Sequence, residues 1–168
     1  MRRAISLTIL VLTALLLQTT VFSEIQLLGV KPELVYLVVI LIAVLEGPTS
    51  GAGAGFAGGM AQDFLLNQPK GITALTLTLL GYSVGMLRQY IVSPSAWLPV
   101  FLVGASTAAG EIFHGLVRFL LGQLDTGWGF QFRVAILAGL YNALLTPVVF
   151  PVIRRVTESS RTRKVLRW

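Results

Sequence analysis

The residues best suited to chemistry lie in one apolar stretch, where Glu111, His114 and Arg118 follow one another at helical spacing. On a helix these positions form a stripe along one face. Glu-x-x-His binds metal in helical di-iron proteins, but such a site needs a second motif and further carboxylates. The chain has one histidine in total. We therefore predict no metal site and no cofactor, and we expect Arg118 or His114 to neutralise Glu111 or Asp63. A proton relay through Glu111 is the alternative.

No catalytic constellation accompanies this stripe. A serine nucleophile of the hydrolase type would be marked by G-x-S-x-G, which the sequence does not contain, and cysteine is absent. To predict an enzyme, we would need a set of side chains that could act together as catalytic acid, base or nucleophile, and the sequence shows no such set. We predict a protein that is not an enzyme.

Further polar residues lie in the other apolar stretches. Gln18, Asp63 and His114 each fall about five residues from the centre of their stretch, all toward the same expected face. At 1.5 Å per residue that is about 7–8 Å from the middle, so we expect one shared layer, with Gln62 beside Asp63. We favour the interpretation that these side chains satisfy one another. The alternative is a small cavity, open to the outside, that binds a ligand or a partner's side chain.

Glycine recurs every four residues between positions 49 and 66. Gly51, Gly55 and Gly59 form one ladder, and Gly58 lies beside it. Small residues at this spacing let membrane helices approach backbone to backbone. We therefore expect these glycines to form a face that accepts a partner's transmembrane helix. The segment also fits G-x-G-x-x-G, but a dinucleotide site needs a strand before the glycines, and here they lie inside an apolar span.

The composition explains why these polar residues are so few. Of 168 residues, 55% are hydrophobic and 12% are charged, and the mean hydropathy is +0.80. A soluble protein of this size covers most of its surface with polar groups. The composition excludes a soluble globular fold, a disordered chain and a nucleic-acid-binding module, despite the net charge of +6. The bilayer is therefore the expected solvent.

Hydropathy divides the chain into apolar segments that are long enough, or nearly so, to cross a bilayer. Their approximate bounds are residues 4–22, 33–45, 49–66, 71–87, 97–121 and 132–153. We predict an all-α integral membrane protein with a single bundle of about six transmembrane helices over residues 1–153, followed by a basic cytoplasmic tail over residues 154–168.

The distribution of basic residues predicts the orientation. Six spans with the N-terminus inside leave four basic residues outside: Lys31, Lys70, Arg118 and Arg133. The other nine lie inside: Arg2, Arg3, Arg88, Arg154, Arg155, Arg161, Arg163, Lys164 and Arg167. Basic residues concentrate on the cytoplasmic side of membrane proteins. We expect both termini in the cytoplasm. A five-span arrangement, with the second and third segments merged, would place the basic tail outside.

Several short motifs, in order, resemble those of a known family. Gly29-Val-Lys-Pro-Glu-Leu34 precedes the second segment, and Gly59-Met-Ala-Gln-Asp-Phe-Leu65 closes the third. Lys70-Gly-Ile-Thr-Ala-Leu75 follows, and then Gly81-Tyr82, with Arg88 at the end of the fourth segment. This order resembles MreD, the small integral membrane protein of the bacterial rod-shape system, over about residues 1–90.

The resemblance implies a non-enzymatic subunit of the cell-elongation machinery in the bacterial plasma membrane. Its implied partners are MreC, in the membrane and on the outer side, and indirectly MreB and the RodA glycosyltransferase with its penicillin-binding protein, besides membrane lipids. It also implies a fold similar to the six-helix substrate-binding subunits of energy-coupling-factor vitamin transporters. A subunit of such a transporter is the alternative function.

Overall fold

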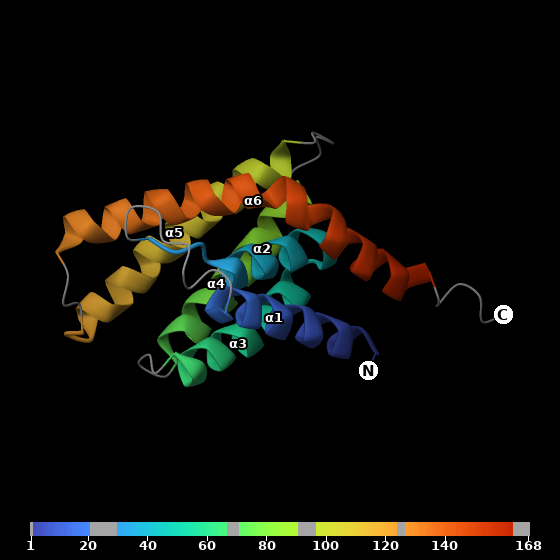
Figure 1. The fold of residues 1–168 in the computed structure, drawn as a ribbon, viewed down its shortest axis with the longest axis horizontal. Coiled ribbons are helices and arrows are strands. Elements are labelled where there is room, and N and C mark those ends of the chain that lie inside the picture. Colours follow the sequence, from blue (N-terminus) through green and yellow to red (C-terminus); the bar gives the residue numbers. More distant parts are fainter. Residues whose placement is uncertain (1, 21–29, 67–70, 91–96, 124–126, 163–168) are drawn as a thin grey trace.

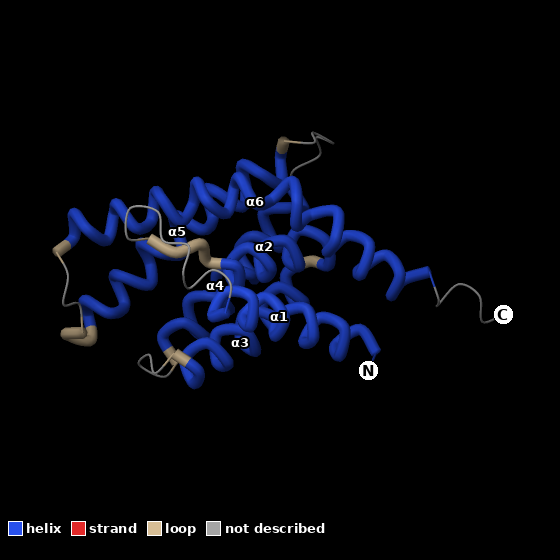
Figure 2. The backbone as a smooth tube through the Cα atoms, viewed as in Figure 1, coloured by secondary structure: helices blue, strands red, loops and turns tan. Residues whose placement is uncertain are grey.

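The computed structural model describes residues 2–20, 30–66, 71–90, 97–123 and 127–162, and these form a bundle of helices (Figure 1). No strand occurs among the described residues (Figure 2). The helices are α1 (Arg2–Thr20), α2 (Leu34–Glu46), α3 (Pro48–Leu65), α4 (Ile72–Tyr90), α5 (Leu98–Leu120) and α6 (Trp128–Thr162). Each apolar segment of the sequence therefore corresponds to one helix, and the prediction of an all-helical protein is confirmed.

The short helix α2 lies at the centre of the bundle. It has 13 residues, and eleven of them, Leu34–Val44, are buried. Its length of about 20 Å is less than the roughly 30 Å of a bilayer's hydrocarbon core. A helix that is hydrophobic on every side must be covered on every side. The remaining helices supply that cover, and α2 contacts each of the other five.

The chain reverses between α2 and α3 at a single residue. Gly47 has a φ of +97°, a conformation that residues with a side chain rarely adopt. Pro48 follows as the first residue of α3, where its missing N–H would have no helical partner. Gly47 ends α2 and Pro48 starts α3, so a single residue separates the two helices.

The glycines of α3 pack against α4. A Cβ atom on Gly51 would overlap the backbone of Gly81, one on Gly55 would overlap Leu77, and one on Gly59 would overlap Ala74. Gly58 instead faces Val11 of α1 and Val35 of α2, while Gly85 of α4 meets Pro48. The expected close approach of backbones is present. In this structure α4, rather than a partner's helix, lies against the face formed by Gly51, Gly55 and Gly59.

The hairpin of α5 and α6 packs beside the other helices and extends past them (Figure 1). α6 runs for 35 residues and contains Pro147 and Pro151. A proline inside a helix removes a backbone hydrogen bond and bends the helix, and α6 changes direction along its length (Figure 1). The helix continues to Thr162, so the first part of the expected tail is helical, while residues 163–168 lie outside the described residues.

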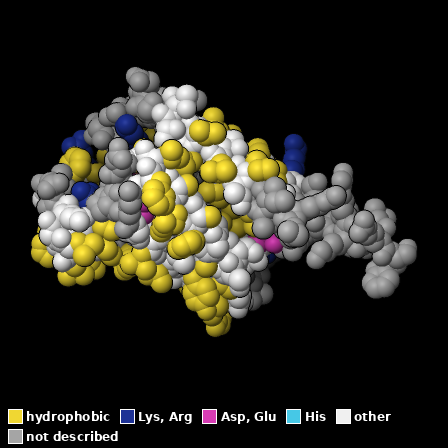
Figure 3. Space-filling model, turned by 90° about the horizontal axis from the view of Figure 1, so that it is seen from below, with side chains coloured by type: hydrophobic (Ala, Val, Ile, Leu, Met, Phe, Trp, Pro, Cys, Tyr) yellow, Lys and Arg dark blue, Asp and Glu magenta, His cyan; other side chains and the backbone are white. Residues whose placement is uncertain are grey.

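The outer surface is rich in apolar side chains. Phe101 and Leu144 are each 75% exposed, and Leu16 is 63% exposed. Hydrophobic side chains spread over much of the face shown in Figure 3. By length and composition, two helices of the described chain suffice to cross a membrane: α5 and residues Trp128–Glu158 of α6. Ser6–Thr20 and Leu34–Glu46 are shorter apolar helices.

The contact between α3 and α4 leads to a first prediction. Gly55→Ala is expected to lower the free energy of unfolding by roughly 1–3 kcal/mol, because the added methyl group overpacks a contact between two backbones. Gly53→Ala is the matched control: Gly53 is exposed, and a Cβ there meets nothing within 4 Å. Thermal unfolding in detergent measures both. Equal loss of stability in the two variants would contradict the packing.

Candidate functional site

Three side-chain amides, from α1, α3 and α6, converge on Glu33, the residue before α2. Gln18 Nε2 donates to Glu33 Oε2 at 3.0 Å, and Gln62 Nε2 donates to the same oxygen at 3.3 Å. Asn142 Nδ2 donates to the Glu33 backbone oxygen at 2.9 Å. Gln18, Gln62 and Asn142 are buried. We call these four residues the Glu33 cluster.

The cluster also satisfies the beginning of α2. The first N–H groups of a helix have no partner within the helix and need one elsewhere. Gln18 Oε1 accepts a hydrogen bond from the Val35 N–H at 3.0 Å, so Gln18 caps α2 while its amide nitrogen binds Glu33. The Leu37 N–H donates to the Glu33 backbone oxygen at 3.2 Å. One side chain of α1 thus serves both Glu33 and the helix that follows it.

Asn142 extends the cluster to α5. Its Nδ2 atom also donates to Thr107 Oγ1 at 3.1 Å. Asn142 and Thr107 are fully buried, each with no exposed surface. The side-chain amide oxygens of Asn142 and Gln62 have no hydrogen-bond partner among the described residues. The cluster therefore holds more acceptors than donors.

Asp63 has a different role from the one expected. Its Oδ2 atom accepts hydrogen bonds from the N–H groups of Gly71 at 2.8 Å and Ala74 at 3.3 Å. A carboxylate at this place satisfies free N–H groups and interacts favourably with the positive end of the helix dipole. Asp63 of α3 therefore caps α4 across the chain, at the same helix pair that the glycines bring together.

The stripe on α5 is present, but its members do not pair with one another. Arg118 Nη2 donates to the Gln123 backbone oxygen at 3.1 Å, which closes the end of α5. His114 lies within electrostatic range of Arg118 and Asp63, yet its Nδ1 atom has no hydrogen-bond partner in the described chain. No close ion pair joins Arg118 or His114 to Glu111 or Asp63 within the described residues, although Arg118 lies within electrostatic range of Glu111. Neutralisation of the two carboxylates stays a prediction.

Glu111 contacts α2 and α6 instead. The Tyr36 side chain of α2 lies near the Glu111 carboxylate. Gln131 Nε2 donates to the Glu111 backbone oxygen at 2.8 Å, and Gly115 next to it leaves room for the Gln131 side chain. Glu111 is 8% exposed. The described residues contain no group of three or more His, Cys, Asp or Glu side chains that could hold a metal ion.

The structure thus divides the predicted layer. Gln18 and Gln62 meet at Glu33, Asp63 caps α4, and His114 joins neither group by a hydrogen bond. Glu33 and Asn142 were not among the predicted site residues, although Glu33 lies within the motif Gly29–Leu34. Asn142 could have been predicted from its position, because an amide in the middle of an apolar span needs a hydrogen-bond partner within the protein.

The family model of the rod shape-determining protein MreD matches residues 1–156. The chain belongs to the MreD family. The match extends beyond the first 90 residues, where the motifs lie, and reaches Val156 of α6, so it includes every helix that forms the Glu33 cluster.

MreD membership places the chain in a family of membrane proteins that determine rod shape. The family is structural and is not known for enzymatic activity. The comparison with curated proteins found no match, and the comparison with solved structures found none either. The likeness to vitamin-transporter subunits therefore stays a prediction.

The Glu33 cluster leads to a second prediction, tested by a double-mutant cycle. Asn142→Leu is expected to destabilise the protein by about 1–3 kcal/mol, because the buried Thr107 hydroxyl loses its donor and the Glu33 carbonyl keeps only the Leu37 N–H. Thr107→Val removes the hydroxyl while keeping the shape. The double variant should be more stable than the sum of the single effects predicts, because the two residues are in contact. Chemical or thermal unfolding in detergent measures all four proteins, and strictly additive effects would contradict the contact.

Proposed function

We propose that the chain is a non-enzymatic scaffold subunit of the cell-elongation complex, which binds MreC and helps to control peptidoglycan synthesis and cell shape. MreB and the RodA–penicillin-binding protein pair are reached indirectly, through the complex. Family membership supports the rod-shape role. The observation that carries the rest of the proposal is the use of the buried polar residues: Gln18, Gln62, Asp63 and Asn142 tie helices of this chain to one another.

The surface left for a partner is therefore apolar and outward-facing. The ladder of Gly51, Gly55 and Gly59 is covered by α4, so MreC contact belongs elsewhere on the helices. Large exposed side chains such as Phe101 and Leu144 provide contact area for a partner within the bilayer. Membrane helices associate through packing and hydrogen bonds, because lipid tails are as apolar as the helices themselves.

The proposed arrangement crosses the plasma membrane six times with both termini in the cytoplasm. Nine basic residues then lie inside and four outside, in agreement with the positive-inside tendency. In the proposed arrangement, Gln123, between α5 and α6, lies on the outer side, and Gln89, at the end of α4, lies on the inner side.

Cysteine accessibility tests this arrangement, and the chain has no natural cysteine to interfere. Gln123→Cys should react with a membrane-impermeant maleimide in intact cells, whereas Gln89→Cys should react only after the cells are opened. Gln89 and Gln123 are both exposed. The reverse pattern is what five spans with an inner N-terminus predict, and it would overturn the six-span arrangement.

Co-purification tests the scaffold function. The tagged wild-type chain, co-expressed with MreC of the same organism, should retain MreC in mild detergent. Gly55→Leu should lose MreC and thermal stability together, because the substitution separates α3 from α4, while Gly53→Leu should keep its stability. Failure of the wild-type chain to retain MreC would contradict the proposal. A vitamin that binds at micromolar concentration would instead favour a transporter subunit.

A further inference from the structure

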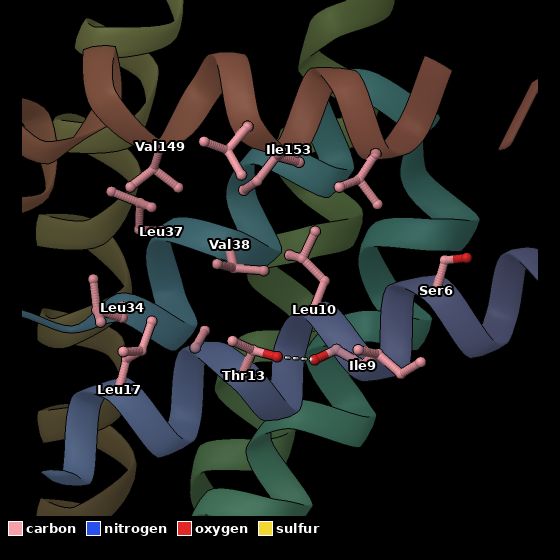
Figure 4. A pocket seen from close by; sticks show the side chains of 13 residues that line it. Ser6, Ile9, Leu10, Thr13, Leu17, Leu34, Leu37, Val38, Val149 and Ile153 are labelled. Carbon is pink, nitrogen blue, oxygen red and sulfur yellow. Dashed lines mark hydrogen bonds between the residues drawn. The ribbon is translucent and has the colours of Figure 1, made fainter. Parts of the chain in front are cut away.

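An apolar groove runs between α1 and α6, with α2 as its floor (Figure 4). Its volume is about 440 Å³. The walls come from Ser6–Leu17 of α1 and Val149–Val156 of α6, and Leu34, Leu37 and Val38 form the floor. The part of α6 that forms the wall begins just after Pro147, so the bent half of the helix encloses the groove.

The lining offers almost no hydrogen-bonding group to an occupant. Thr13 Oγ1 donates to the Ile9 backbone oxygen at 2.8 Å (Figure 4), which turns the hydroxyl back onto its own helix. Ser6 also has a partner within the chain. The other lining residues are Ala, Leu, Ile and Val. The groove therefore suits a hydrocarbon chain, and an occupant with polar groups would lose their hydrogen bonds there.

The length of the groove distinguishes a lipid from a helix. From Ser6 to Leu17 the wall of α1 rises about 17 Å. One leaflet contributes about 15 Å of the roughly 30 Å hydrocarbon core. A partner's transmembrane helix would cross both leaflets and need a groove about twice as long. The groove matches one acyl chain that extends through one leaflet.

Basic residues stand at one end of this groove. Arg154 and Arg155 of α6 lie beside Val156, the last lining residue, and both are exposed. α1 begins at Arg2, one turn before Ser6, and the N-terminal end of α1 and the C-terminal half of α6 lie at the same side of the molecule (Figure 1). Arg154 also pairs with Glu158 at 2.7 Å, an exposed ion pair.

We propose that this groove binds an acyl chain of an anionic phospholipid, with the phosphate of the lipid at the Arg154–Arg155 end. The apolar lining holds the chain, and the arginines select the charge of the headgroup. Basic residues near an anionic membrane surface attract it electrostatically. The proposal does not depend on MreC, because the site is complete within one chain.

Fluorescence quenching by brominated lipids tests the proposal on the full chain in vesicles. Thr13→Cys and Val152→Cys carry a small fluorophore on the two walls, and both positions are exposed and line the groove. Leu12→Cys is the matched control, since it is exposed at the same depth of α1 but does not line the groove. Phosphatidylcholine vesicles contain an equal fraction of either brominated phosphatidylglycerol or brominated phosphatidylcholine.

At both groove positions, brominated phosphatidylglycerol should be favoured over brominated phosphatidylcholine by about tenfold in apparent affinity. At Leu12 the two lipids should quench equally. Arg154→Gln with Arg155→Gln should remove the preference, whereas Glu158→Gln should preserve it. Equal quenching by the two lipids at the groove would overturn the proposal. So would an unquenched groove beside a quenched Leu12, since that result means a second copy of the chain or a protein partner fills the groove.

Discussion

The start of α2 inside the protein is the constraint on which the other contacts depend. A helix that begins among other helices needs partners for its first N–H groups, and water cannot supply them all. Gln18 and Glu33 provide them from neighbouring parts of the chain. Because Glu33 in turn accepts from Gln62 and Asn142, the same requirement links α1, α3 and α6 around α2.

Two kinds of contact complete the bundle. Around Glu33, side-chain amides reach across several ångströms and fix which helices meet. Between α3 and α4, the backbones themselves touch, and Asp63 caps one helix from the other. The amides determine which helices pack together through the geometry of their hydrogen bonds. The glycines do so because, without side chains, they let two backbones touch. Neither contact contains a group of three or more His, Cys, Asp or Glu side chains that could hold a metal ion in the described part of the chain.

The sequence predicted the helices and their approximate bounds because apolar runs and their breaks are local properties. The glycine ladder likewise predicted a close helix contact, and this contact is present. Its partner could not be predicted, because small-residue spacing is the same for a helix of this chain and for a helix of another. The prediction of one layer containing Gln18, Asp63 and His114 rested only on their similar expected depth in the membrane. Their hydrogen bonds depend instead on which faces of the helices point toward each other. The central role of Glu33 could not be predicted, because it lies at the end of an apolar segment, where charged residues are common.

The glycine-rich composition of α3 has a consequence for the assembly of the protein. Leucine and phenylalanine favour insertion into the bilayer far more than glycine does, and α3 is not among the helices that are apolar enough to cross alone. Since Gly51, Gly55 and Gly59 contact α4 along the length of α3, the two helices form a natural unit of integration. We expect α3 to settle in the membrane only when α4 has left the ribosome, so that this pair enters as a hairpin rather than one helix at a time.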